Sequence, residues 1–148
     1  MKSTVKLFFI AVLFLTAISF TNSYSQDSQN YSIEGIWERA STDEALSGAR
    51  VQVTKDGDVF TGKYTLVTQQ MVQACYETGE VKWFNIIKGN KGLYNMSDLY
   101  KTADCSSKFT DKYIEFVDES KINITAMGIP SNTDENFQVW VRVVESSK

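Results

Sequence analysis

The fold prediction begins with the stretch VFTGKYTLV, residues Val59–Val67, in which one set of alternate residues is mainly apolar and the other polar. Such alternation is typical of a β-strand with one buried face. The face expected to point inward carries Phe60, Gly62, Tyr64 and Leu66. The preceding turn KDGD, residues 55–58, holds the Asp-Gly pair typical of a tight hairpin. Gly62 predicts a space, left either for a bend in the strand or for a group inside the fold.

Further short alternating segments run along the rest of the chain, separated by turn residues. No helical stripe of ten or more residues is evident, although Ser41–Gly48 fits one helical turn. We therefore predict an all-β, antiparallel up-and-down meander that closes into a small, roughly eight-stranded barrel, since closure removes exposed strand edges. Such a barrel holds packed side chains or one small ligand. The other expected strands are Gly35–Ala40, Arg50–Thr54, Met71–Tyr76, Val81–Ile87, Leu93–Ala103, Tyr113–Val117, Lys121–Met127 and Phe137–Val144.

The first 25 residues have the three parts of a secretory signal peptide. Lys2 and Lys6 provide positive charge, Leu7–Ala17 is apolar apart from Thr16, and Ser23–Ser25 offers small residues for cleavage. A membrane anchor is the alternative, but spanning a bilayer takes about 20 apolar residues. We expect a secreted or periplasmic protein with no membrane span in its mature form.

The mature chain is expected to comprise a flexible segment, residues 26–32, and one domain, residues 33–148. The leader holds two of the 15 basic residues and none of the 18 acidic ones, so the mature chain carries a formal charge of −5. Nucleic-acid binding usually needs a basic face, so this acidity argues against a nucleic-acid partner.

Cys75 and Cys105 are the two cysteines. In an exported chain, an even pair favours a disulfide, and closing this loop is worth about 3–4 kcal/mol. The alternative is two separate buried thiols. A meander places the strand Val81–Ile87 between them, so the bridge requires Asp104–Lys108 to fold over the end of that strand.

Gly35-Ile36-Trp37 at the start of the first strand, together with Arg142 in the last one, resembles the lipocalin pattern. The resemblance implies that Trp37 plugs one barrel end, that Arg142 stacks on it, and that Gly35 allows a sharp entry turn. The chain lacks the family's T-D-Y pattern and a recognisable C-terminal helix, and so looks more like compact lipocalin-like domains of exported bacterial proteins. The alternative makes Trp37 an ordinary core residue and Arg142 an exposed one.

Catalytic motifs are not evident in the sequence. The chain has no histidine, which excludes Ser-His and Cys-His pairs and removes the commonest metal ligand. We therefore expect no enzyme, no metal and no cofactor. The acids that could form a glycosidase-type pair are Asp98, Asp104, Asp111, Glu115, Asp118 and Glu119.

The inward aromatic residues favour a barrel that binds a small hydrophobic or amphipathic ligand. The alternative is a solid barrel that binds an envelope protein or a glycan through its outer surface, in which case Trp83 and Trp140 should be exposed. The residues expected to bind the ligand are Phe60, Tyr64, Leu66, Phe84, Tyr94, Met96 and Phe116.

Overall fold

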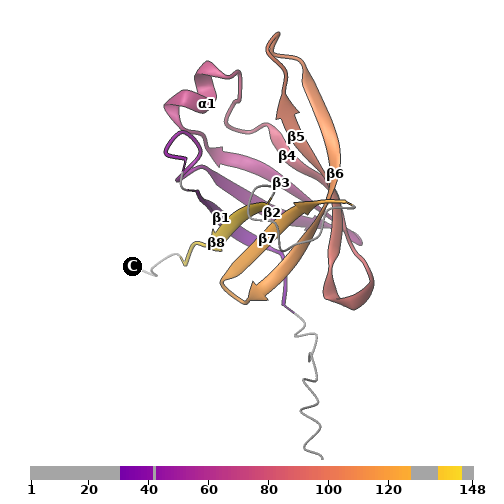
Figure 1. The fold of residues 1–148 in the computed structure, drawn as a ribbon. Coiled ribbons are helices and arrows are strands. Elements are labelled where there is room, and N and C mark those ends of the chain that lie inside the picture. The colour runs from indigo at the N-terminus through magenta and orange to yellow at the C-terminus, as the bar shows by residue number, and fades with distance from the viewer. Residues whose placement is uncertain (1–30, 42, 128–136, 145–148) are drawn as a thin grey trace, which may run out of the picture.

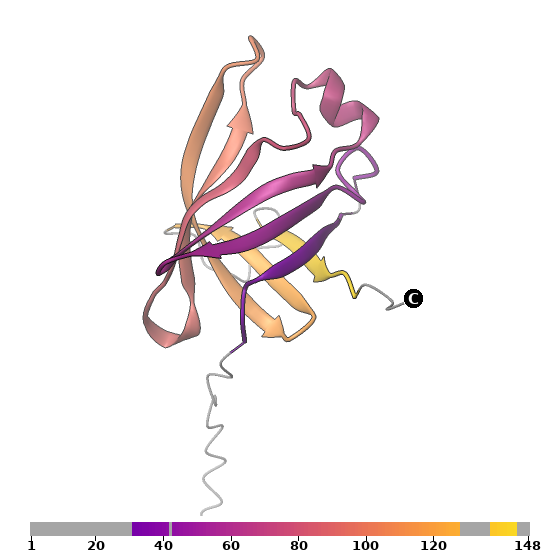
Figure 2. The same cartoon turned by 180° about the vertical axis from the view of Figure 1, so that it is seen from behind.

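The computed structural model describes residues 31–41, 43–127 and 137–144 (Figure 1). The expected signal peptide lies outside the described residues. Eight antiparallel strands follow one another around a closed barrel, which confirms the predicted fold class (Figures 1 and 2). Their bounds are β1 Gly35–Ala40, β2 Arg50–Asp56, β3 Val59–Leu66, β4 Val81–Lys88, β5 Tyr94–Lys101, β6 Ser107–Asp118, β7 Lys121–Ala126 and β8 Phe137–Arg142.

The barrel closes where β1 pairs with β8. Trp37 lies opposite Arg142, and Arg39 lies opposite Trp140. All other neighbouring strands in the barrel are consecutive in sequence, as expected of a meander. The result is compatible with a lipocalin-like barrel.

The segment expected as a strand at Met71–Tyr76 is instead a short helix, α1 (Gln69–Gln73), and this prediction was wrong. Thr68 begins the helix, because its side chain accepts a hydrogen bond from the backbone N–H of Met71. Met71 is the buried residue of α1 and joins the core. A 3₁₀ turn, η1 (Asn90–Gly92), joins β4 to β5.

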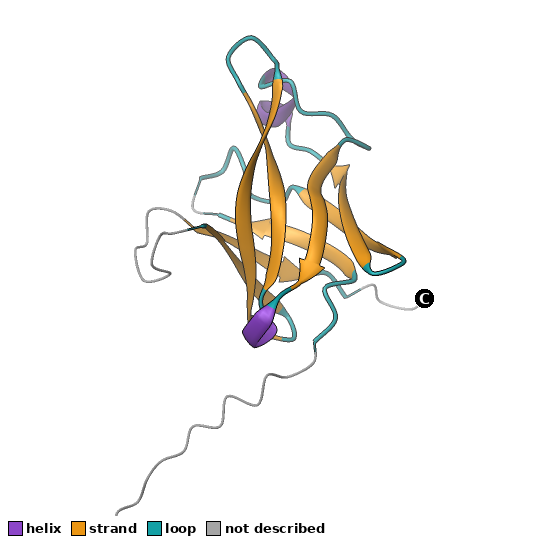
Figure 3. Ribbon diagram, turned by 90° about the vertical axis from the view of Figure 1, so that its right-hand side faces the viewer, coloured by secondary structure: helices purple, strands orange, loops and turns teal. Residues whose placement is uncertain are grey.

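Strand β6 is much longer than the expected Tyr113–Val117. Residues 107–111 are exposed, because this half of the β5–β6 hairpin extends past the barrel on the side of α1 (Figure 3). With no core to contact, these residues lack the alternation that reveals a strand.

One end of the barrel is closed around Trp37, whose side chain is fully buried. Its Nε1 donates a hydrogen bond of 2.9 Å to the carbonyl of Ile33. The Arg142 guanidinium lies 4.3 Å from the centre of the indole ring. The same guanidinium donates to three backbone carbonyls, those of Ser32, Glu34 and Glu119. The structure therefore brings Trp37 and Arg142 together, as the resemblance implied.

Gly35 makes this arrangement possible. Its φ of +131° suits glycine, and a Cβ atom there would lie 2.6 Å from an Arg142 nitrogen. The chain joins the barrel earlier than expected, because Tyr31 accepts a hydrogen bond from the Tyr94 hydroxyl and its ring contacts Phe116. Tyr31 and Ser32, which belong to the segment predicted to be flexible, thus contact the barrel.

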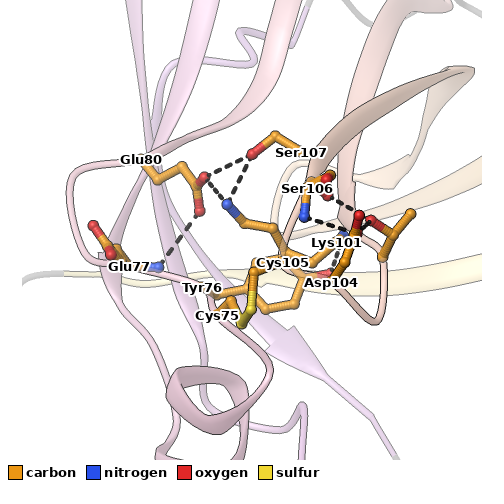
Figure 4. Close-up of a disulfide and its surroundings, with 10 residues drawn as sticks. Cys75, Tyr76, Glu77, Glu80, Lys101, Asp104, Cys105, Ser106 and Ser107 are labelled. Carbon is orange, nitrogen blue, oxygen red and sulfur yellow. Dashed lines mark hydrogen bonds and ion pairs between the residues drawn. A yellow bond between two sulfur atoms is a disulfide. The ribbon is translucent and has the colours of Figure 1, made fainter.

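The two cysteines form the predicted disulfide, with their Cα atoms 5.5 Å apart (Figure 4). Cys75 lies in the link between α1 and β4, not on a strand, and Cys105 lies in the β5–β6 turn. The link and the turn are at the end of the barrel opposite the one where the chain enters β1 (Figure 1). Beside the disulfide, Glu80 pairs with Lys101, and the backbone N–H of Lys101 donates to the Tyr76 hydroxyl.

No helix among the described residues is both long and apolar enough to cross a membrane.

Replacing Trp37 with alanine should lower the free energy of unfolding by about 3–5 kcal/mol, because removing the indole leaves a void that the neighbouring side chains fill only partly. Urea unfolding of the chain from Gln26 onward, followed by circular dichroism, measures the loss. Phe109→Ala is the control, because Phe109 is exposed and its loss should cost no more than about 0.5 kcal/mol. A loss below about 1 kcal/mol for Trp37→Ala would contradict the structural role of the plug.

Replacing both Cys75 and Cys105 with serine should cost about 3–4 kcal/mol, because the unfolded chain regains the freedom of a loop of about 30 residues. Thermal or urea unfolding of both proteins gives the difference. A reducing agent should lower the stability of the wild type to that of the variant and leave the variant unchanged. Equal stability of oxidised and reduced wild type would contradict this account.

Candidate ligand-binding cavity

A cavity of about 290 Å³ lies at the end of the barrel opposite Trp37. The β1–β2 connection contributes Leu46, helix α1 contributes Met71, and the link after it contributes Tyr76. The strands contribute a mixed set of polar and aromatic side chains. Those that matter for its chemistry are Arg39 from β1, Tyr64 from β3, Lys82 from β4, Asp98 from β5, Lys112 from β6, and Gln138 and Trp140 from β8.

Asp98 is the centre of the polar side of the cavity and is almost completely buried. One carboxylate oxygen, Oδ1, lies 2.6 Å from Nζ of Lys82. The other, Oδ2, lies 2.9 Å from Nζ of Lys112 and accepts a hydrogen bond of 2.8 Å from the Gln138 amide. Lys82 also donates to the carbonyl of Leu99 at 2.8 Å. Side chains from three other strands therefore hold one buried carboxylate.

Two lysines set the ionisation of this carboxylate. Burial by itself would raise the pKa of Asp98, but the charges of Lys82 and Lys112 outweigh it and hold the pKa below its ordinary value. Burial lowers the pKa of Lys82, and the Asp98 carboxylate opposes that change. Burial, reinforced by the charge of Asp98, raises the pKa of Tyr64. The Tyr64 hydroxyl therefore stays protonated and can donate a hydrogen bond in the cavity.

Arg39 is the third cation of the cavity. Its guanidinium lies 5.6 Å from the centre of the Trp140 ring. Its Nε is buried and has no hydrogen-bond partner among the described residues. Burial lowers the pKa of Arg39, although the charges of Asp98 and Asp43 oppose this, and arginine stays protonated in proteins.

Aromatic rings pack against one another at the wall of the cavity. The Trp140 ring meets Trp83 edge-on with centroids 4.8 Å apart, and Tyr64 meets Tyr76 at 5.9 Å. A Cβ atom on Gly62 would lie 2.9 Å from the Trp83 ring. The space predicted at Gly62 is thus filled by a group inside the barrel, the Trp83 indole.

Of the seven residues expected to bind a ligand, Tyr64 lines the cavity. The others form two groups. Phe60, Tyr94, Met96 and Phe116 belong to the packed interior of the barrel, where Phe60 contacts Tyr94 and Phe116 contacts Trp37. The structure does not bring these four to the cavity.

Leu66 and Phe84 face solvent, so the expectation that they point inward was wrong. Leu66 is 47% exposed because β3 ends there, at the rim, where both of its faces are open. Phe84 is 55% exposed because β4 is irregular at this point: Asn85 has a φ of +54°, and the pairing with β5 shifts between Phe84 and Ile87. At such an irregularity, the side chains of a strand stop pointing alternately inward and outward in the order that the sequence suggests.

The two tryptophans expected at the surface by the outer-surface hypothesis, Trp83 and Trp140, are both buried. A different aromatic pair lies on the outside of β4–β6. Phe84 and Phe109 have ring centroids 6.2 Å apart and line a hollow together with Val81 and Ser97.

The polar residues that line the cavity were not predicted as a site, although the spacing of most of them from core residues indicates that they point inward. Arg39 is two residues from Trp37, Asp98 two from Met96, and Lys112 two from Ile114. Gln138 is two residues from Trp140. Each therefore shares the inward face of its strand with a core residue. Lys82 has no such signal, because both Lys82 and Trp83 are buried in the irregular strand β4.

The other acids proposed for a catalytic pair do not join Asp98, which is the one carboxylate among the described residues that line the cavity. Asp104, in the β5–β6 turn, and Asp118, at the end of β6, are exposed, and hydrogen bonds from Thr102 and Ser120, respectively, lower their pKa values. Asp111 and Glu119 are also exposed, and Glu115 is half-buried. Within the described residues, no group of three or more potential metal ligands occurs.

Comparison of the chain with protein-family models, with curated proteins and with solved structures gives no match.

Asp98→Asn should lower the free energy of unfolding by about 3–5 kcal/mol, because it leaves the buried charge of Lys82 without its partner. Urea unfolding at pH 7 measures the effect. Asp111→Asn is the matched control, since this exposed carboxylate accepts one hydrogen bond from Ser97, and its loss should cost about 1 kcal/mol or less. Equal losses for the two variants would contradict a special role for Asp98.

The difference in stability between wild type and Asp98→Asn should depend on pH. A carboxyl whose folded pKa is depressed contributes stability that is fully present above its unfolded pKa, about 3.9, and is lost as the pH falls through the lower folded value. The difference should therefore stay constant above about pH 5 and shrink below about pH 4. Urea unfolding from pH 7 to pH 2 tests this, and a difference that persists at pH 2 would exclude the ionised form of Asp98 as its source.

Proposed function

We propose that this chain is an exported, non-enzymatic, lipocalin-like domain that binds a small amphipathic molecule inside the barrel. The observation that supports this most directly is the cavity of about 290 Å³ at one end. Ligand pockets commonly begin at about this volume. The opposite end is filled by Trp37 and covered by Arg142, so a ligand would enter beside α1 and the disulfide.

The lining favours an amphipathic ligand over a purely hydrophobic one. Leu46, Met71 and Trp140 offer apolar surface, while the lysines and Asp98 are charged. A wholly apolar molecule would strip water from the charged groups without replacing its hydrogen bonds, which costs free energy. A molecule with one polar end satisfies both kinds of surface.

Isothermal titration calorimetry of the mature, disulfide-bonded protein with 3-phenyl-1-propanol tests the proposal. This neutral amphipath has an apolar ring and one hydroxyl, and we expect saturable binding of one molecule. Leu46→Trp should weaken that binding at least about tenfold by filling the cavity. Val72→Trp is the matched control, because Val72 is exposed on α1 and does not line the cavity.

Native mass spectrometry of protein purified from its own host is the complementary measurement, with a co-purifying small molecule as the expected result. A wild type that binds no probe and is always empty, or a Leu46→Trp variant that binds as well as wild type, would overturn binding in this cavity.

The alternative function uses the outer surface to bind an envelope protein or a glycan. Trp83 and Trp140 do not support it because they are buried, whereas the exposed pair Phe84 and Phe109 favours it. Replacing both phenylalanines with serine should then abolish glycan-array or pull-down binding and leave the cavity's affinity for 3-phenyl-1-propanol unchanged. Binding that survives the double replacement would exclude this surface.

A further inference from the structure

The charges around the cavity do not balance. Arg39, Lys82 and Lys112 line it as cations, and Asp98 is the one carboxylate among its described lining residues. Asp98 divides its two oxygens between Lys82 and Lys112, so a single negative charge faces two ammonium groups. With Arg39 included, the cavity has a surplus of positive charge that the described protein groups do not neutralise.

The nearby acids outside the cavity are engaged elsewhere. Asp43 is exposed in the β1–β2 connection, where its carboxylate accepts a hydrogen bond from the backbone N–H of Ala45. Glu80 forms an ion pair with Lys101 and accepts a hydrogen bond from Ser107 (Figure 4). Their charges act on Arg39 only from a distance or not at all, so the surplus inside the cavity remains.

Arg39 has unused hydrogen-bonding capacity. A guanidinium carries five N–H donors in a planar fork that matches the two oxygens of a carboxylate. No described residue accepts a hydrogen bond from a side-chain nitrogen of Arg39, whose guanidinium lies over the Trp140 ring. Since Nε itself is shielded, the two terminal Nη nitrogens are the donors that an anion in the cavity can reach.

The remaining walls suit an apolar body attached to that anion. The aromatic side chains Tyr64, Tyr76 and Trp140 also line the cavity, and Leu46 and Met71 add apolar surface. A cavity of about 290 Å³ exceeds what an inorganic anion would fill. The combination fits a compact organic acid better than a free phosphate or sulfate ion.

We propose that the ligand is a small organic carboxylate with an apolar, preferably aromatic, body, whose carboxylate is held by Arg39 and Lys112. This inference rests on the proposed function, since it specifies the ligand class of the same cavity. Arg39 supplies the paired donors. Lys112 supplies a second positive charge, which Asp98 neutralises only in part because Asp98 also pairs with Lys82. Lys82 stays with Asp98 and the Leu99 carbonyl.

Three probes that share one body and differ in charge test the proposal. They are 3-phenylpropanoate, 3-phenyl-1-propanol and 3-phenylpropylammonium, each titrated calorimetrically into the mature protein at pH 7. We expect the carboxylate to bind at least about tenfold more tightly than the alcohol, and the ammonium compound to bind most weakly. Inorganic phosphate at the same concentration should not displace the carboxylate.

Arg39→Gln should weaken 3-phenylpropanoate binding about tenfold and change the affinity for the alcohol less than about twofold. Arg50→Gln is the matched control, because Arg50 is on the neighbouring strand β2 and pairs with Glu38 on the outside of the barrel. It should change neither affinity. If Arg39→Gln does not fold, Lys112→Gln gives the same comparison, because Asp98 retains Lys82 in that variant.

The outcomes separate this inference from the proposed function. Equal affinity of the wild type for the alcohol and the carboxylate would overturn the carboxylate assignment and leave a ligand-binding barrel. Displacement by phosphate would show that the site recognises an inorganic anion and would also overturn the assignment. Failure of all three probes to bind would overturn the proposed function and this inference together.

Discussion

The contact between Arg142 and Trp37 is the constraint on which the rest of the barrel depends. One guanidinium covers the indole and donates to the carbonyls of Ser32, Glu34 and Glu119, which belong to the chain entering β1 and to the turn before β7. It thereby ties the first strand, the last strand and the β6–β7 turn together at one end. Gly35 leaves the space that this requires. Once β1 and β8 are paired here, the sheet has no free edge.

Closure divides the interior into two chemically different halves. Around Trp37, the barrel is filled by packed side chains such as Phe116, Tyr94 and Phe60. Beyond Trp140, the same inward positions carry Arg39 and Asp98 and leave a cavity. The filled half supplies the stability that allows charged groups to be buried in the other half. The disulfide and α1 hold one wall of the cavity, because Met71 and Tyr76 lie beside Cys75.

Much of the architecture follows from local pattern, and the misplaced elements have identifiable causes. Strand β3 was evident because Phe60, Gly62 and Tyr64 alternate with polar residues, whereas α1 was missed because five residues with one buried side chain carry no helical period. The outer half of β6 has no core contact and hence no alternation. Phe84 was assigned to the wrong face because the irregularity in β4 reverses which residues point inward, and nothing in its sequence marks that point.

The sequence by itself determined the all-β class, the order of most strands, the Cys75–Cys105 pair, and the residues that close one end. The class and the strand order follow from period-2 alternation and turn residues, which act between neighbours in the chain. The cysteine pair follows from an even count in a chain expected to be exported, and the residues that close one end follow from the resemblance to lipocalins. Only the tertiary structure decided that most of the aromatic residues predicted to bind a ligand pack against one another in the interior. It also decided that Arg39, Lys82, Asp98 and Lys112 meet at a cavity. Those four side chains come from four strands, so their charges interact only after the sheet has curled and the pairing registers are set.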